Sequence, residues 1–165
     1  MIKQFIPQEY CLKCRTCCRF SEEGSIWSPI LLDGEMDKLL EHKIPPSFFS
    51  YDKRIRLQSH PRQDNFACSF FDSGDNKCKI YDLRPFECQL YPFLLNRDSN
   101  AIFLALDLRC PFIQQNLQPA VFQEYAKEIV DFLKSPEGQA LLKNNPQLIQ
   151  EYPGVLNVAE LYEVE

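Results

Sequence analysis

The chain has 165 residues and a formal net charge of −5, with 45% hydrophobic and 25% charged residues. This length and composition are those of an ordinary globular protein of one domain. An acidic surface gains nothing from counterion release at a phosphate backbone, so we expect no nucleic-acid partner.

The start of the chain does not resemble a secretory signal. Residues 1–10 contain one lysine, no long apolar run and no small-residue cleavage site. The longest apolar run, residues 101–106, is far too short to cross a bilayer. These features predict a cytoplasmic protein without membrane association. Cysteines in that reducing compartment usually bind metals or act in catalysis, and rarely form structural disulfides.

The first predicted elements in chain order are a helix, an edge strand and a hairpin. Residues 29–42 contain a short amphipathic helix that ends at Ile44-Pro45-Pro46. Its apolar side is formed by Met36, Leu39 and Leu40. Residues 53–57 alternate polar and apolar side chains, which predicts an edge strand. Residues 66–71 and 78–81 flank a glycine-containing turn and predict a hairpin.

A second helix and a second hairpin follow. Residues 82–88 predict a short helix with Asp82 as its cap and Pro85 in its first turn. Residues 93–97 and 101–106 flank a polar turn and predict the second hairpin.

The C-terminal part is expected to be helical. The strongest helix covers residues 120–134, and two shorter helices are predicted near 136–144 and 156–163. At three-to-four spacing, one face of the strongest helix carries Val121, Phe122, Tyr125, Ile129, Phe132 and Leu133.

The predicted fold class is therefore α+β. We expect one small domain over residues 1–165, with two short hairpins around a cysteine-ligated metal site. Residues 10–112 form the metal-binding region, and residues 113–165 form a helical C-terminal extension that covers it.

Cysteine is the residue type that points to chemistry in this chain. All eight are candidate thiolate ligands, and four of them fall within eight residues. They are Cys11, Cys14, Cys17, Cys18, Cys68, Cys78, Cys88 and Cys110. Buried free thiols, which pack as small hydrophobic groups, are the structural alternative.

One allocation of these ligands includes an iron–sulfur cluster. The first three cysteines have the C-x2-C-x2-C spacing that opens a bacterial ferredoxin site, in which a remote Cys-Pro completes a cluster. A four-iron cluster would then use Cys11, Cys14, Cys17 and Cys110. Zinc or a second cluster would use Cys18, Cys68, Cys78 and Cys88.

The rival allocation is zinc throughout, since zinc prefers four tetrahedral thiolates, often as C-x2-C pairs. The downstream cysteines Cys68, Cys78 and Cys88 are spaced ten apart, so an ordinary zinc ribbon with two such pairs fits poorly. Adjacent Cys17 and Cys18 are expected to point at two different centres, or one of them is not a ligand. The ferredoxin spacing favours iron–sulfur at one site or more.

Basic residues gather around the cysteines of this acidic chain. They are Lys13, Arg15, Arg19, Lys77, Lys79, Arg84 and Arg109. Their charge is expected to lower the pKa values of the thiols and to offset the negative charge of a thiolate site.

The order of these motifs resembles the YkgJ-type cysteine-cluster family, whose CxxCxxCC domains are classed as zinc- or iron-chelating. The resemblance covers roughly residues 10–112. It rests on the opening cysteines, on Cys78-Lys-Ile-Tyr-Asp-Leu-Arg-Pro-Phe-Glu-Cys88, and on Cys110-Pro111. It implies that the cysteines bind zinc or an iron–sulfur cluster, but it implies no particular activity. Thr16 departs from the glycine usual in such proteins, which makes the loop before Cys17 stiffer.

We also predict the roles of several side chains other than the cysteines. Arg84 is expected to donate to a ligand thiolate or cluster sulfide, with an ion pair to Glu87 as the alternative. Tyr81, Tyr91 and Phe93 are predicted to form a dry apolar shell around the site. His42 and His60 are expected to be solvent-exposed or capping, because neither lies near a cysteine in the sequence.

Three functions remain open at this point. The first is a metal-binding cysteine-cluster protein. The second is an iron–sulfur-dependent redox or protein-modifying enzyme, since the related domains of the family include a lysine methylase. The third is a zinc-stabilised adaptor that docks a protein partner through residues 119–163. The sequence contains no H-E-x-x-H, P-loop or G-x-G-x-x-G motif, which argues against a standard metalloprotease, nucleotide hydrolase or dinucleotide enzyme.

Overall fold

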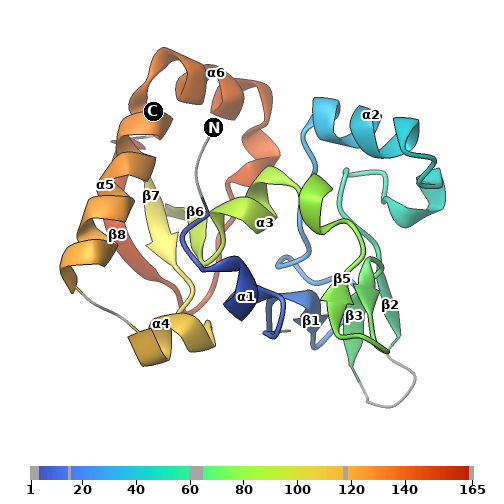
Figure 1. Ribbon diagram of the computed structural model, residues 1–165. Helices are drawn as coiled ribbons and strands as arrows, with labels where there is room; N and C mark the ends of the chain where they lie inside the picture. The colour runs from blue at the N-terminus through green and yellow to red at the C-terminus, as the bar shows by residue number, and fades with distance from the viewer. Residues whose placement is uncertain (1–3, 15, 60–64, 117–118, 164–165) are drawn as a thin grey trace. The chain divides into compact units, whose positions relative to one another are not determined.

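The computed structural model describes residues 4–14, 16–59, 65–116 and 119–163 (Figure 1). The chain forms two compact units. The N-terminal unit is Ile6–Gln89, and the C-terminal unit consists of Met1–Phe5 and Leu90–Glu165. Both units combine short helices with small antiparallel sheets, which confirms the predicted α+β class. The predicted single domain over residues 1–165 stays a prediction.

The N-terminal unit is made of short elements. Its helices are α1 (Gln8–Cys11), α2 (Asp33–Glu41) and α3 (Phe86–Leu90), whose last residue belongs to the C-terminal unit. It also has 3-10 turns at Thr16–Cys18, Pro46–Phe48 and Tyr81–Leu83. Its strands are β1 (Arg19–Phe20), β2 (Leu57–Ser59), β3 (Phe66–Cys68), β4 (Phe71–Asp72) and β5 (Lys77–Cys78).

Two small sheets organise this unit. Strand β3 is the centre of the sheet β1-β3-β2, where Cys68 lies opposite Leu57. Strands β4 and β5 form a separate hairpin in which Cys78 lies opposite Phe71. The predicted hairpin of residues 66–71 and 78–81 is therefore only partly right, because β3 pairs with strands far away in the sequence.

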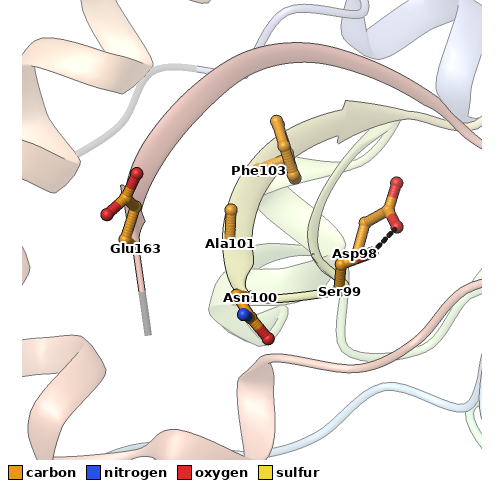
Figure 2. A pocket seen from close by; sticks show the side chains of 6 residues that line it. All are labelled: Asp98, Ser99, Asn100, Ala101, Phe103 and Glu163. Atoms are coloured by element: carbon orange, nitrogen blue, oxygen red, sulfur yellow. Dashed lines mark hydrogen bonds between the residues drawn. The ribbon is translucent and has the colours of Figure 1, made fainter. Parts of the chain in front are cut away.

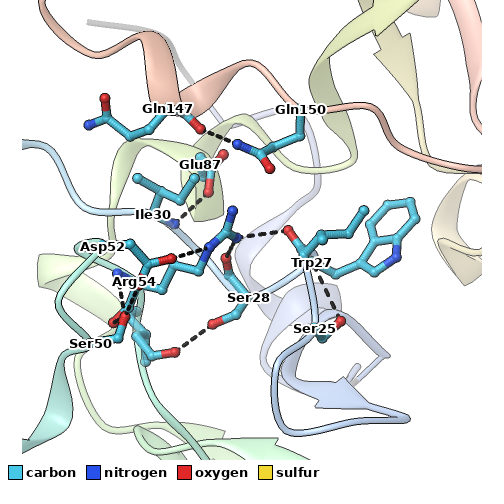
Figure 3. Close-up of polar contacts among 12 residues, drawn as sticks. Ser25, Trp27, Ser28, Ile30, Ser50, Asp52, Arg54, Glu87, Gln147 and Gln150 are labelled. Atoms are coloured by element: carbon cyan, nitrogen blue, oxygen red, sulfur yellow. Dashed lines mark hydrogen bonds and ion pairs between the residues drawn. The ribbon is translucent and has the colours of Figure 1, made fainter.

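The predicted strand over residues 53–57 is displaced. The regular strand β2 begins at Leu57, and before it only isolated bridges join Ile30 to Arg54 and Phe49 to Ile55. Scattered backbone hydrogen bonds, such as the one from the Ile55 N–H to the Pro29 carbonyl oxygen at 2.9 Å, and side-chain hydrogen bonds hold this stretch. The Arg54 guanidinium donates from Nη1 to the carbonyl oxygens of Ile26 and Ser28, both at 2.9 Å (Figure 3).

Helix α2 confirms the predicted helix within residues 29–42. Leu39 is 1% exposed, and Met36 packs against the same core. Leu40 is 38% exposed, so its predicted place on the apolar side is wrong. The core of the unit comprises Phe20, Leu31, Leu39, Phe49, Ile55, Leu57, Ala67, Cys68, Phe70, Phe71 and Ile80.

The C-terminal unit is built around one three-stranded antiparallel sheet, β6-β7-β8. Its strands are β6 (Phe93–Asp98), β7 (Ala101–Leu106) and β8 (Leu156–Glu163). Its helices are α4 (Pro111–Asn116), α5 (Pro119–Lys134) and α6 (Pro136–Asn144), and a 3-10 turn follows at Pro146–Leu148. The second predicted hairpin and the helices at 120–134 and 136–144 are confirmed.

Strand β8 corrects the third C-terminal prediction. Residues 156–163 form no helix and pair antiparallel with β7, with Leu156 opposite Leu106 and Glu163 opposite Ala101. Gly154 has φ of +71° in the turn that starts this strand, a backbone conformation that glycine tolerates well. Because β7 offers a long edge to pair with, tertiary pairing decides the structure here. The C-terminal extension is therefore not purely helical.

An aromatic cluster holds helix α5 in its unit. Phe93 of β6 stacks on Phe122 of α5 at a centroid distance of 5.3 Å. The ring centroid of Phe5 lies 4.8 Å from that of Tyr125 and 5.9 Å from that of Phe112. Val121, predicted on the same apolar face of α5, is instead 52% exposed.

The helix predicted over residues 82–88 is displaced, because Asp82 lies inside a 3-10 turn and α3 begins at Phe86, after Pro85. Two other helices were not predicted. Helix α4 starts at Pro111, directly after Cys110, and proline in the first turn is a helix-start signal that the sequence does contain. Helix α1 has only four residues and too little periodicity to detect. Among the described residues, no helix has the length and apolar character needed to cross a membrane.

The glycine in α6 allows a close approach that predicts a stability effect. A Cβ atom on Gly138 would lie 2.2 Å from the Phe132 carbonyl oxygen and 2.7 Å from Leu133 Cα. We expect Gly138→Ala to lower the free energy of unfolding by about 2 kcal/mol, because backbone atoms must shift.

Gly34 in α2 gives the matched control for chemical denaturation. A Cβ atom there would meet nothing within 4 Å, so Gly34→Ala should be neutral or stabilising by up to about 1 kcal/mol. Equal effects of the two substitutions would contradict the close approach at Gly138.

Candidate metal centre

The fold collects most of the cysteines in one unit. Seven of the eight lie in the N-terminal unit, and only Cys110 lies in the C-terminal unit. All eight side chains are thiols, and the described residues contain no disulfide.

Different elements present these thiols. Cys17 and Cys18 end a 3-10 turn, Cys68 ends β3, Cys78 ends β5, and Cys88 lies in the middle of α3. Cys68 belongs to the hydrophobic core, while Cys18 and Cys78 pack against it. The thiols thus lie at the edge of an apolar core, where burial disfavours an uncompensated thiolate.

Cys17 and Cys18 interact directly with each other. Their side-chain hydrogen bond, followed by burial, raises the pKa of Cys17 well above its usual value. For Cys18 that bond lowers the pKa, but burial and the charges of Cys68, Cys88 and Cys78 leave it raised. That these neighbours point at two different centres, or that one of them is not a ligand, stays a prediction.

The remaining thiols are coupled to the same pair. Burial raises the pKa of Cys68 to about 12, and the charges of Cys78 and Cys17 act in the same direction. Burial raises the pKa of Cys88 well above its usual value, with further contributions from Cys68, Cys17 and Cys78.

Cys78 differs from the others because a cation acts on it. Burial raises its pKa, the Arg84 guanidinium lowers it, and Cys17 and Cys11 raise it again. Each of these thiols therefore lies within electrostatic range of several others. We name the set Cys17, Cys18, Cys68, Cys78 and Cys88 the five-thiol cluster; Cys14 acts on it through Cys17 and Cys11 through Cys78.

The donor set fits a soft metal. Zinc and iron–sulfur centres prefer thiolates, and the cluster offers more than the four that zinc takes. Within the described ranges, no group of three or more Cys, His, Asp or Glu side chains stands in an arrangement that could hold a metal ion. Metal binding therefore requires the cluster thiols to converge further and lose their protons.

A comparison with known protein families gives a match that includes the eight cysteines. Residues 10–111 match the CxxCxxCC family, described as a "Putative zinc- or iron-chelating domain". The chain belongs to the CxxCxxCC family. The match spans nearly the same residues as the expected metal-binding region, 10–112, and the whole five-thiol cluster lies within this CxxCxxCC domain. No solved structure matches the chain.

The backbone of the CxxCxxCC motif accommodates Thr16, the residue that stands in place of the usual glycine. Thr16 lies in the 3-10 turn that carries Cys17 and Cys18, and it is exposed. A 3-10 turn has negative φ angles, so this backbone position does not require glycine. The Cys14 thiol lies 3.6 Å from the Thr16 hydroxyl oxygen.

The predicted effect of the basic residues is mostly wrong. Where a shift is resolved, the thiol pKa values are raised, and Arg84 is the only basic residue in the described ranges among the main causes, lowering the pKa of Cys78. Lys79 pairs with Asp72 at 3.8 Å, and the Arg19 guanidinium lies over the Phe71 ring. Arg15 lies outside the described residues. Burial and thiol–thiol repulsion outweigh these surface cations.

Arg84 lies beside the cluster and over a tyrosine. Its guanidinium carbon is 3.6 Å from the centroid of the Tyr81 ring, and Nε donates to the Tyr81 carbonyl oxygen at 2.7 Å. The carboxylate of Glu87, its alternative partner, accepts from the backbone N–H of Ile30. A guanidinium stacked on an aromatic ring is held in one place at low cost in entropy.

The other predicted shell residues belong to the C-terminal unit. Phe93 is buried within the aromatic cluster of that unit, and the Tyr91 hydroxyl donates to Asp107 at 3.2 Å. His42 is exposed, and its Nδ1 lies 2.8 Å from the Lys38 carbonyl oxygen at the end of α2, which confirms the capping role. His60 lies outside the described residues.

Asp107 has a role that the sequence pattern does not reveal. The residue is 2% exposed, and its carboxylate accepts hydrogen bonds from the Arg109 backbone N–H, Nε and Nη2, each at 2.9 Å. Its backbone carbonyl accepts from the Cys110 N–H at 3.2 Å. These bonds fix the turn that leads to buried Cys110. Nothing in the sequence around it signals this role, because an acidic residue two positions before an arginine is common.

A hollow of about 420 Å³ opens at one end of the sheet in the C-terminal unit (Figure 2). It is lined by Asp98, Ser99, Asn100, Ala101, Phe103 and Glu163. No thiol lines it, so it is separate from the candidate metal centre.

The raised thiol pKa values predict how metal affinity depends on pH. In the metal-free protein the thiols of the five-thiol cluster are protonated at neutral pH, and each thiol that binds metal must lose its proton. Apparent affinity should therefore rise with pH from about 6 to 9, with about one proton released per ligating thiol. Calorimetric titration with Zn²⁺ in buffers of different ionisation enthalpy measures this number. An affinity that does not change with pH would contradict it.

Proposed function

We propose that this protein binds a thiolate-ligated metal centre in its N-terminal unit. The observation that carries the proposal is the five-thiol cluster, five mutually coupled thiols beside an apolar core. Buried thiols within electrostatic range of one another repel one another as thiolates, and a bound cation offsets that repulsion. Family membership supports chelation of zinc or iron as the general activity.

We further propose an iron–sulfur cluster, with zinc as the alternative. One observation supports iron–sulfur, namely the ferredoxin spacing of Cys11, Cys14 and Cys17. When bound, such a cluster supplies one-electron chemistry. The residues of this chain would supply thiolates and keep bulk water from them, because Cys68 and its neighbours are part of the core.

The full set of proposed ligands keeps all eight cysteines. Cys110 is buried at the start of α4 with its turn fixed by Asp107, which suits a ligand held in one position. Arg84 is proposed as a donor to the thiolate of Cys78, on whose pKa it already acts. Such a centre is stable in a reducing compartment, and we propose the cytoplasm.

The adaptor function has less support. Helix α5 packs against α6 and β8 of its own unit, so its apolar face is already used within the protein. We therefore propose that the C-terminal unit covers its own sheet. No contact of the described residues favours the lysine methylase-like reaction over simple metal binding.

Metal content after strictly anaerobic purification tests the proposal. Wild-type protein should contain iron and acid-labile sulfide in near-equal amounts and show a brown chromophore. Cys88→Ser should lose most of the metal, because it removes a thiol at the centre of the five-thiol cluster. Cys110→Ser is the comparison that decides whether the C-terminal unit contributes a ligand.

The metal found in the wild-type protein decides between the alternatives. Zinc alone in colourless protein would overturn the iron–sulfur assignment and keep metal binding. Wild-type protein with neither metal, and no uptake of Zn²⁺ or Fe²⁺ after anaerobic reduction, would overturn metal binding itself.

A further inference from the structure

A half-buried brace of two carboxylates joins helix α3 to the region of α2. Glu35, in the first turn of α2, accepts the backbone N–H of Phe86 on Oε1 at 2.6 Å and that of Leu32 on Oε2 at 3.0 Å. In the opposite direction, Oε2 of Glu87 accepts the backbone N–H of Ile30 at 2.6 Å (Figure 3). The brace therefore links segments more than 50 residues apart in the sequence.

Helix α3 needs such support. It has five residues, Phe86–Leu90, and a helix that short is not stable alone in water. Pro85 precedes it, and a proline side chain cannot accept a hydrogen bond as Ser, Thr, Asn or Asp does at a helix N-terminus. The Glu35 carboxylate takes this role from another helix, and its negative charge is also favoured at a helix N-terminus.

The cysteine of this helix is central to the five-thiol cluster. Cys88 follows Glu87 directly and is within electrostatic range of Cys68, Cys17 and Cys78. Its position depends on where α3 begins and how α3 is rotated. The bond from Phe86 to Glu35 fixes the start, and the bond from Ile30 to Glu87 fixes the rotation.

We infer that Glu35 is a positioning residue of the metal centre: by holding the start of α3, it places the Cys88 thiol among the other thiols. This inference rests on the proposed function. The Glu35 carboxylate accepts from the backbone N–H groups of Leu32 and Phe86, and so it acts on the thiol through the helix.

Anaerobic competition for Zn²⁺ between the protein and a chromophoric chelator tests the inference. Glu35→Ala should weaken Zn²⁺ binding about 10–100-fold, the usual effect of losing a group that orients a metal ligand. Glu35→Gln keeps one carbonyl oxygen as acceptor and should lose less. Glu41→Gln, an exposed position of the same helix, is the matched control and should bind Zn²⁺ as the wild type does.

A double-mutant cycle separates positioning from general stability. If Glu35 acts through Cys88, Glu35→Ala should weaken binding no further in the Cys88→Ser background than Cys88→Ser does alone. Equal losses with and without Cys88 would overturn the inference, as would wild-type affinity in Glu35→Ala. Circular dichroism and the fluorescence of Trp27, the single tryptophan, check that each variant is folded.

Hydrogen exchange in Glu35→Gln tests the inference even if Glu35→Ala does not fold. In Glu35→Gln, the Phe86 amide should exchange faster than in the wild type, and Zn²⁺ affinity should fall in parallel. Faster exchange with unchanged affinity would overturn the inference. Wild-type protein that binds no Zn²⁺ and no iron would instead show that the proposed function fails, and the inference with it.

Discussion

The burial of several thiols within electrostatic range of one another is the constraint on which the proposed metal centre depends. The N-terminal unit places five thiols within electrostatic range of one another at the edge of an apolar core. Burial and mutual repulsion keep them protonated, as the raised pKa values of Cys17, Cys68 and Cys88 show. A metal cation reverses this balance, because it attracts the thiolates that otherwise repel one another. Metal binding must therefore bring the thiols closer together and displace their protons.

The N-terminal unit is built from short strands and helices that are cross-linked to one another. Strands of two or three residues and a five-residue helix bury little surface each, so they depend on one another for stability. Their cross-links are polar as well as apolar. Arg54 ties two loops together through backbone carbonyls, and Glu35 ties α2 to α3 through backbone N–H groups. A bound metal would add ligand bonds to the same set of segments, so metal binding and folding are expected to be coupled.

The sequence predicts the parts of this protein whose patterns are local. The helices at 120–134 and 136–144 have a clear apolar period, and the hairpin at 93–106 has two apolar runs around a polar turn; all three are confirmed. The identity of the cysteine ligands can also be proposed from spacing and family resemblance, and family membership is confirmed.

Elements whose structure is decided by residues far away in the sequence could not be predicted in this way. Residues 156–163 contain enough apolar residues for either a helix or a strand, and pairing with β7 decides for the strand. The sign of the thiol pKa shifts depends on burial, which the flanking lysines and arginines do not reveal. Glu35 gives no signal, because its partner Phe86 becomes a neighbour only in the folded chain.

X-ray absorption at the edge of the metal found in anaerobically purified protein tests the central claim most directly. A centre held by the cysteine thiolates should show a first shell of sulfur alone, at about 2.3 Å if the metal is zinc. A sulfur scatterer shell followed by a short metal–metal vector would identify a cluster. A first shell composed mainly of nitrogen or oxygen would contradict the account, because the metal would then be bound away from the thiols.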